Sequence, residues 1–123
     1  MSIQGIDFIA LPAADMTRAV AFYRDVLGLK PGSDFGGQFV EFEVGDATLA
    51  IFDPKAQGRP FEPVRAGAIA LRVPDVAATV AALKAAGVTF MAEMFDSGVC
   101  KGAFFQDSEG NSLSLHHRYA PEV

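Results

Sequence analysis

Short segments of alternating hydrophobic and polar residues follow one another along the chain, and one pattern occurs twice. Ile9-Ala10-Leu11 recurs sixty positions later as Ile69-Ala70-Leu71, and Asp15 recurs at the same offset as Asp75. An Ala-rich stretch with the apolar spacing of a helix follows each aspartate and ends at a glycine, a residue that commonly terminates helices. The repeat predicts two related strand–helix units.

Alternation at a period of two predicts three further strands after each helix. The predicted strands are 6–11, 29–35, 39–44, 47–52, 68–73, 88–95, 99–106 and 112–116, and the predicted helices are 16–27 and 76–86. Segment 53–66, with three prolines and a glycine, reads as a linker. The predicted fold class is α+β: a single domain over 1–123, made of two tandem βαβββ modules at about 5–52 and 67–118.

Composition narrows the range of partners. Half of the 123 residues are hydrophobic and the net charge is −5, which favours a folded domain and argues against nucleic acid or an anionic membrane as partner. No apolar run approaches the roughly 20 residues that a membrane span needs. Cys100 is the lone cysteine, and the first residues lack a signal-peptide pattern. We therefore expect a cytoplasmic protein.

Two motifs carry a family resemblance. The run from Phe22 to Leu29 (FYRDVLGL), after Asp15, resembles the first helix of the vicinal oxygen chelate superfamily, which includes glyoxalase I, extradiol dioxygenases, fosfomycin-resistance enzymes and bleomycin-binding proteins. The run from Phe104 to Leu113 (FFQDSEGNSL) is similar to its closing hairpin, with Ser108 and Glu109 in place of the usual Pro and Asp. The resemblance implies that curled mixed sheets of two modules surround a central cavity, and that the chain forms a homodimer.

The resemblance also implies where a metal would bind. Enzymes of the superfamily hold a divalent cation through His, Glu or Gln on four strands, and the corresponding positions here are Phe8, Ala50, Ala68 and Ser114. A phenyl ring and two methyl groups offer no donor to a hard cation, and a lone hydroxyl is a poor one. We therefore expect no metal and no other cofactor, which argues against glyoxalase I or dioxygenase activity of the usual mechanism.

Strand alternation predicts which side chains share the face of those positions. Glu41, Glu43 and Phe39 are candidates to join them, and Cys100 also falls on this face. The expected small-molecule site combines aromatic, small and a few polar groups, as such pockets usually do. Its predicted ligand-binding residues are Phe8, Ala50, Phe52, Ala68, Arg72, Phe104, Ser114 and His116.

Each of these residue types has a structural alternative. The phenylalanines either stack on a ligand or fill the space of the missing metal site. Arg72 is either an anion clamp or a solvated or Glu-paired charge, and Glu41 and Glu43 are either ligand groups or solubility charges. Cys100 is either a nucleophile or an inert thiol. His116 either touches ligand or is structural, and the adjacent His117 points to the helix side or to solvent.

The sequence favours a metal-free protein that binds an unidentified small molecule in the cavity between its modules. A planar, apolar or cationic molecule fits the phenyl rings and acidic charge best, with Arg72 as the one feature against this expectation. The alternative is a lyase, isomerase or dioxygenase of the same superfamily with a non-standard site, using groups such as His116 or Glu41. A regulatory or accessory subunit is a third hypothesis.

Overall fold

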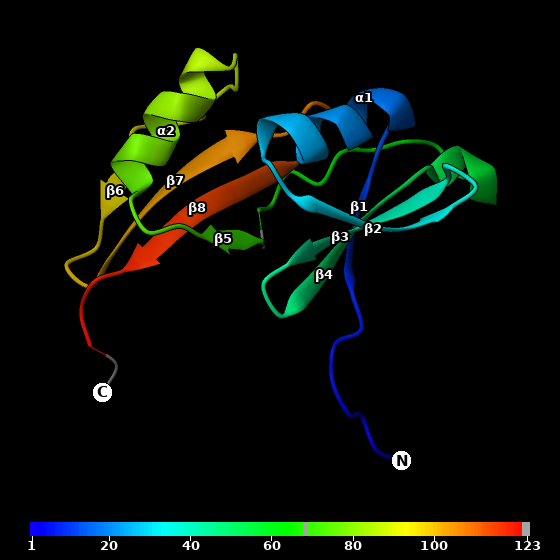
Figure 1. Cartoon of the computed structure of the whole chain (residues 1–123), viewed down its shortest axis with the longest axis horizontal. Helices are drawn as coiled ribbons and strands as arrows, with labels where there is room; N and C mark the ends of the chain where they lie inside the picture. Colours follow the sequence, from blue (N-terminus) through cyan, green and yellow to red (C-terminus); the bar gives the residue numbers. More distant parts are fainter. Residues whose placement is uncertain (68, 122–123) are drawn as a thin grey trace. The chain divides into compact units, whose positions relative to one another are not determined.

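The computed structural model describes residues 1–67 and 69–121, and its internal contacts divide the chain into two compact units, Met1–Pro63 and Val64–Val123. Each unit contains a strand, a helix and three further strands, in that order (Figure 1). The α+β class and the repeated βαβββ order are therefore confirmed. No helix in the described part of the chain has the length and apolar character needed to cross a membrane.

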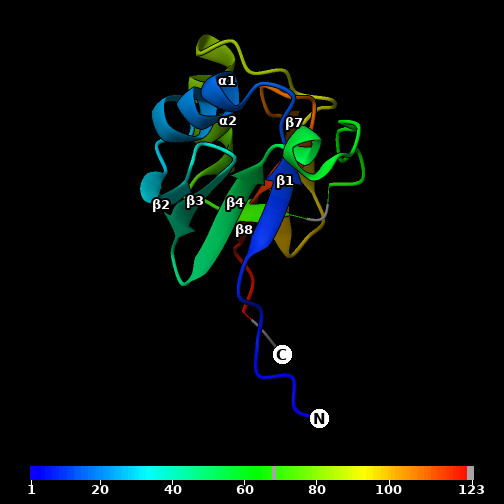
Figure 2. The ribbon, with the colours of Figure 1, turned by 90° about the vertical axis from the view of Figure 1, so that its right-hand side faces the viewer.

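In the first unit, one mixed sheet has the strand order β1-β4-β3-β2 (Figure 2). β1 and β4 are parallel, whereas the β4–β3 and β3–β2 pairs are antiparallel. Residues 1–8 precede β1 and run away from the sheet. The elements are β1 (Ile9–Pro12), α1 (Met16–Ala21), the π-helical turn η1 (Phe22–Val26), β2 (Lys30–Phe35), β3 (Phe39–Val44), β4 (Ala47–Phe52) and the 3₁₀ helix η2 (Pro54–Gln57).

The second unit repeats this topology with the strand order β5-β8-β7-β6. β5 and β8 are parallel, and the other two pairs are antiparallel. Its elements are β5 (Ala70–Arg72), α2 (Val76–Ala85), β6 (Phe95–Asp96), β7 (Cys100–Gln106) and β8 (Ser112–Arg118).

The repeated aspartates begin the two helices. A carboxylate oxygen of Asp15 accepts from the amide of Arg18 at 3.1 Å, and Asp75 accepts from the amide of Ala78 at 3.0 Å. Both aspartates thus satisfy helix amides that have no partner within the helix. Gly28 and Gly87, which follow the helices, have φ angles of +68° and +88°, a conformation that glycine adopts without strain.

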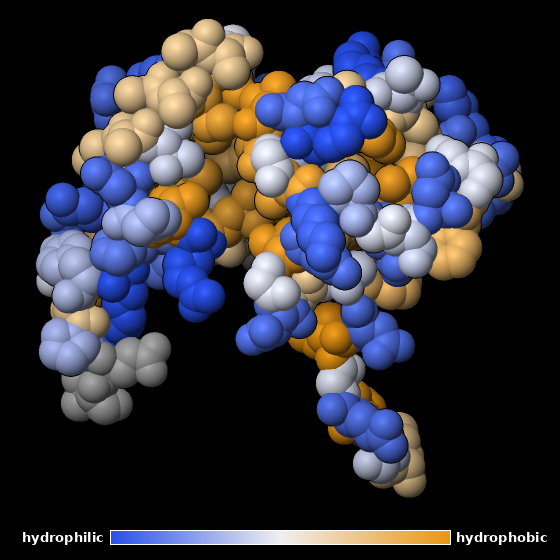
Figure 3. Space-filling model, in the orientation of Figure 1, coloured by the Kyte–Doolittle hydropathy of each residue, from blue (hydrophilic) through white to orange (hydrophobic). Residues whose placement is uncertain are grey.

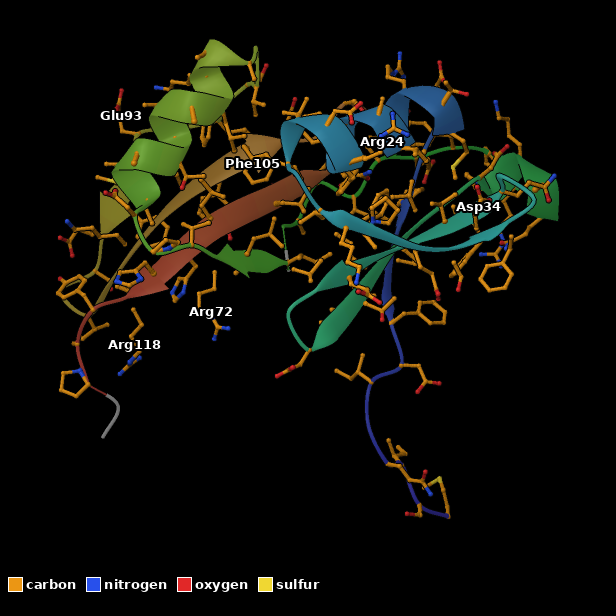
Figure 4. The ribbon with its side chains drawn as sticks, viewed as in Figure 1. Arg24, Asp34, Arg72, Glu93, Phe105 and Arg118 are labelled. Carbon is orange, nitrogen blue, oxygen red and sulfur yellow. The ribbon has the colours of Figure 1, made fainter. Side chains whose placement is uncertain are left out.

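A helix covers one face of each sheet. Tyr23 is fully buried, and its ring centroid lies 5.9 Å from that of Phe42 on β3. In the second unit, Phe105 lies between α2 and the sheet (Figure 4). The opposite side of α2 carries exposed alanines, which give the pale hydrophobic surface of Figure 3. The core side chains between helix and sheet are Leu11, Val40, Phe42, Leu49 and Ile51 in the first unit and Val76, Leu83, Ala103, Phe105, Leu113 and Leu115 in the second.

Two predicted elements of the first unit have different bounds in the structure. The first strand begins at Ile9 instead of residue 6, and it continues through Pro12, whose missing N–H is tolerated at a sheet edge. The predicted helix 16–27 is α-helical only to Ala21. It continues as a π-helical turn, in which the amide of Leu27 donates to the carbonyl of Phe22, five residues earlier.

The predicted strand 88–95 is wrong for most of its length, because β6 covers only Phe95–Asp96. Phe90 forms an isolated bridge with Phe105, and Phe95 pairs with Gly102. The edge segment advances five residues between these two pairs, from Phe90 to Phe95, whereas β7 advances only three. Two extra residues of the edge segment therefore bulge out and interrupt the ladder. The ring of Phe95 occupies the space that a Cβ on Gly102 would need.

A buried polar network closes the β7–β8 hairpin. One carboxylate oxygen of Asp107 accepts from the amides of Glu109 and Asn111 at 2.8 and 2.9 Å, and the other accepts from the Asn111 side chain at 2.9 Å. The Asn111 amide oxygen accepts from the backbone of Val64 at 2.8 Å. Asn111 therefore joins the hairpin turn to the segment that begins the second unit.

We predict that Asn111→Ala destabilises the protein by about 2–4 kcal/mol, since it removes two side-chain hydrogen bonds and leaves buried polar groups without them. The matched control is Asp34→Ala, which removes one exposed turn hydrogen bond, from the Gly37 amide at 2.7 Å. This control should cost about 1 kcal/mol or less. Urea unfolding measures both, and equal losses for the two variants would contradict the prediction.

Candidate functional site

Side chains that alternate with the core point to the other face of each sheet, here called the open face. In the first unit, Ala50 pairs with Ala10 on one side and with Glu41 on the other. Cross-strand partners share a face, so these three side chains form one row. The next row is Pro12, Phe52 and Phe39.

Phe8 joins this open face although it precedes β1. Its ring packs edge-on against that of Phe39, with the centroids 5.2 Å apart. Phe39 also contacts Phe35, at a centroid distance of 6.0 Å. The structure thus brings together Phe8, Ala50 and Phe52, the three predicted ligand-binding residues of the first unit.

The second unit has the same arrangement with different chemistry. Ser114 pairs with Ala70 and with Phe104, and the next row contains Arg72, His116 and Gly102. Arg72 extends from β5 away from α2 (Figure 4). Arg72, Phe104, Ser114 and His116 therefore share the open face of this unit. Ala68, the remaining predicted residue, lies outside the described residues.

Burial divides the predicted residues into two groups. Ala50 is completely buried and Ser114 is 7% exposed, so both lie at the base of their sheet's open face. Phe8 is 46% exposed and Phe104 37%, so their rings remain partly accessible to solvent. Phe104 also lies beside Phe95, with the ring centroids 5.9 Å apart. Each open face thus combines a base of small side chains with exposed aromatic rings.

The residue types at the positions that the resemblance assigns to metal ligands do not fit a divalent cation. Ala50 and Ser114 have equivalent places in the two sheets, because Ala50 pairs with Ala10 and Ser114 with Ala70, the repeat partner of Ala10. Neither methyl nor phenyl groups donate electron pairs to a metal. Within residues 1–67 and 69–121, no three His, Cys, Asp or Glu side chains come close enough to hold a metal ion.

The charged residues near the open faces have different surroundings. Glu43 is exposed and forms an ion pair with Lys30 at 3.3 Å, as a solubility charge would, whereas Glu41 is half-buried beside Ala50. Arg72 is exposed and has no ion pair within the described residues. The Cys100 thiol is partly exposed, with its sulfur 3.2 Å from the hydroxyl of Ser97.

The sequence reasoning did not find a polar pocket on the helix side of the second unit. It has a volume of about 470 Å³. Its lining residues are Pro74, Asp75, Val76 and Ala77 at the start of α2, together with Asp96, Lys101, His117 and Tyr119. Lys101 and His117 are cross-strand partners, and strand alternation predicts that they face away from the open face. Asp96 and Tyr119 lie at the ends of the sheet, where no regular alternation predicts their positions.

A short hydrogen bond organises this pocket. The Tyr119 hydroxyl donates to a carboxylate oxygen of Asp96 at 2.6 Å, and the amide of Gly98 donates to the same oxygen at 2.9 Å. The hydrogen bond from Tyr119, followed by that from Gly98, lowers the pKa of Asp96 below its ordinary value. The same bond to Asp96 raises the pKa of Tyr119. At neutral pH the pair is therefore a carboxylate and a protonated phenol.

Comparison with known proteins places the fold. The model of the Glyoxalase/Bleomycin resistance protein/Dioxygenase superfamily matches residues 5–115. The lactoylglutathione lyase of Agrobacterium tumefaciens is similar in structure, with 26% identity over 94% of each chain and a TM-score of 0.77. A search of curated proteins finds no match.

Two solved structures from Streptomyces sp. CB03234 are also similar. The antibiotic-binding protein TnmS3 is 24% identical over 96% of this chain and 98% of its own, with a TM-score of 0.79, which shows the fold alone. A glyoxalase/bleomycin resistance protein is 25% identical over 89% and 97%, with a TM-score of 0.73. Since the family model spans nearly the whole chain, the chain belongs to the Glyoxalase/Bleomycin resistance protein/Dioxygenase superfamily.

Proposed function

We propose that this chain is a metal-free binding protein that takes up a small organic molecule on the open faces of its sheets. The observation that carries the proposal is the side chains at the family's metal positions: Phe8, Ala50, Ala68 and Ser114. Aromatic rings stand beside these positions in both units. A metal site has thus been replaced by groups that contact organic molecules well.

The fold by itself does not decide between binding and catalysis, because related structures carry the names of a lyase and of an antibiotic-binding protein. A superfamily lyase, isomerase or dioxygenase with displaced donors is the second candidate. Glu41 lies beside Ala50, and His116 lies one row from Ser114, so each is an ionisable group close to a position that the resemblance assigns to a metal ligand. This candidate needs Glu41 and His116 to act as the displaced donors, one from each sheet.

The side chains of the open faces favour one class of ligand. The rings of Phe8, Phe39 and Phe104 offer flat apolar surface, and Glu41 adds negative charge within a chain of net charge −5. A planar, apolar or cationic molecule is therefore preferred over a phosphorylated or polycarboxylate one. Arg72 is the opposing feature, since an unpaired guanidinium attracts a carboxylate.

We also propose a homodimer that works in the cytoplasm. Phe8, Phe35, Phe95 and Phe104 are all more than a third exposed on the open faces. Apolar surface of this kind commonly marks an interface in addition to a ligand site. A single thiol and a net charge of −5 suit a reducing compartment and a partner other than nucleic acid.

The protein as purified should contain far less than one divalent metal per chain. Elemental analysis after dialysis measures this, with added Zn²⁺ and Mn²⁺ as a second arm. The enzyme alternative predicts the opposite result: a stoichiometric metal whose removal abolishes a lyase or dioxygenase activity.

Phe8→Ala should weaken binding of a planar cationic or apolar ligand about two- to tenfold, since one aromatic contact contributes roughly 0.5–1.5 kcal/mol. A thermal-shift screen of charged and neutral compounds identifies such ligands. Arg72→Ala is the opposing test, with the exposed linker residue Arg59→Ala as its matched control. If anionic compounds stabilise the protein most and only Arg72→Ala removes that effect, the ligand is an acid and the proposed class is wrong.

Light scattering should give twice the mass of one chain at micromolar concentration. Replacing the exposed ring in Phe35→Ser should shift the equilibrium toward monomer, because it removes apolar contact area. The matched change Val64→Ser, at an exposed residue outside the open face, should leave the mass unchanged. A mass of one chain at all concentrations would contradict the dimer.

A further inference from the structure

We propose that the second unit has another binding site, on the helix side of its sheet, which takes a small zwitterion that carries a carboxylate and an ammonium group, as an α-amino acid does. The site is the pocket of about 470 Å³ beside the start of α2. This volume lies within the range of roughly 300–1,000 Å³ typical of small-ligand pockets. The proposal is independent of the proposed function, because it concerns the opposite face of the sheet.

Strand register separates the two sites. His116 pairs with Gly102 and Arg72 on the open face, whereas the next residue, His117, pairs with Lys101. Neighbouring residues on a strand point to opposite faces, so His117 and Lys101 point to the side that α2 covers. Further along this side, the rows are apolar: Ala103 with Leu115, then Phe105 with Leu113. The polar pocket thus begins where the helix-side core ends.

The pocket presents an ammonium group and an imidazole that both have unused hydrogen-bonding capacity. The Lys101 ammonium lies 6.0 Å from the ring centroid of Tyr119, but it forms no ion pair within the described residues. The imidazole of His117 likewise has no hydrogen-bond partner among them. Ammonium and imidazole N–H groups are the usual partners of a carboxylate.

The pocket also presents a negative group that is held in place. One oxygen of Asp96 accepts both from Tyr119 and from Gly98, which fixes the carboxylate and leaves its second oxygen without a partner in residues 1–67 and 69–121. An ammonium group would supply that partner. A simple anion would face Asp96 and Asp75, and a simple cation would face Lys101. A molecule with both charges pairs with both groups.

The corresponding pocket of the first unit differs in this respect. It is smaller, at about 290 Å³, and Arg24 and Asp34 are among its lining residues. The Arg24 guanidinium already donates two hydrogen bonds to Asp25, at 2.9 and 3.0 Å, and Asp34 caps the amide of Gly37. Its cation is therefore already in a close ion pair. Lys101 in the second unit is attracted to Asp96, its neighbour across the strands, but forms no close ion pair among the described residues.

The test uses amide NMR spectra of the full chain with three matched probes: L-leucine, N-acetyl-L-leucine, which lacks the ammonium, and L-leucinamide, which lacks the carboxylate. L-Leucine should shift the signals of Val76, Ala77 and Lys101. It should bind at least about tenfold more tightly than either analogue, a difference of about 1.4 kcal/mol. No shift with any probe, or equal binding of an analogue, would overturn the proposal.

Variants locate the site. Lys101→Met and Asp96→Asn, which keep the size of the side chains, should each weaken L-leucine binding about tenfold or more. Lys84→Met is the matched control, since its ammonium lies 5.8 Å from the Phe90 ring outside the pocket. Asp34→Asn is the control for Asp96, since both carboxylates cap a turn glycine. Unchanged binding in Lys101→Met and Asp96→Asn would overturn the assignment, and Arg72→Ala should leave binding unchanged.

Discussion

Each four-stranded sheet of this protein has a single helix to cover it, and the rest of the structure depends on that constraint. The helix buries one face, where Tyr23 packs on Phe42 and Phe105 lies beneath α2. Among the described residues of each unit, no helix covers the other face. Because side chains alternate between the faces, every strand must carry core residues at one set of positions and a different chemistry at the next. The side chains of the open face do not pack against the helix, so they are available for function.

Hydrogen bonds at the end of the second sheet fix the strand register, and the register decides which side chains lie on which face. The Asp107–Asn111 network fixes the β7–β8 hairpin, and the bond from Val64 ties the start of the second unit to it. A shift of one residue in β8 would move Ser114 and His116 to the helix side and bring Leu113 and Leu115 to the open face. The buried hydrogen bonds of the turn and the apolar rows of the core both oppose that shift. The register on which a ligand site depends is thus specified twice.

Much of the architecture follows from local patterns. β3 and β4 have the predicted bounds, because their alternation is regular and the turn glycine Gly45 separates them. The prediction of a strand at 88–95 is wrong because the rings of Phe90 and Phe95 pack on β7 and set the course of this edge segment. Local sequence patterns do not contain that information. The π-helical turn has the apolar spacing of an α-helix and so looks like one in the sequence. The rows on the open faces were predictable from alternation, whereas the polar pocket joins groups from four separate segments.

The positions that the resemblance assigns to metal ligands carry packing groups instead of metal donors. Titratable metal ligands must be deprotonated to bind, so metal binding is coupled to their pKa and to folding. Ala50 instead contributes a fully buried methyl group, and Phe8 an aromatic contact with Phe39. Both groups contribute to the packing of the open face, a role that requires no bound ion. Aromatic surface remains exposed on the open face, and under the proposed function it is this surface, rather than any single ionisable group, that contacts the organic molecule.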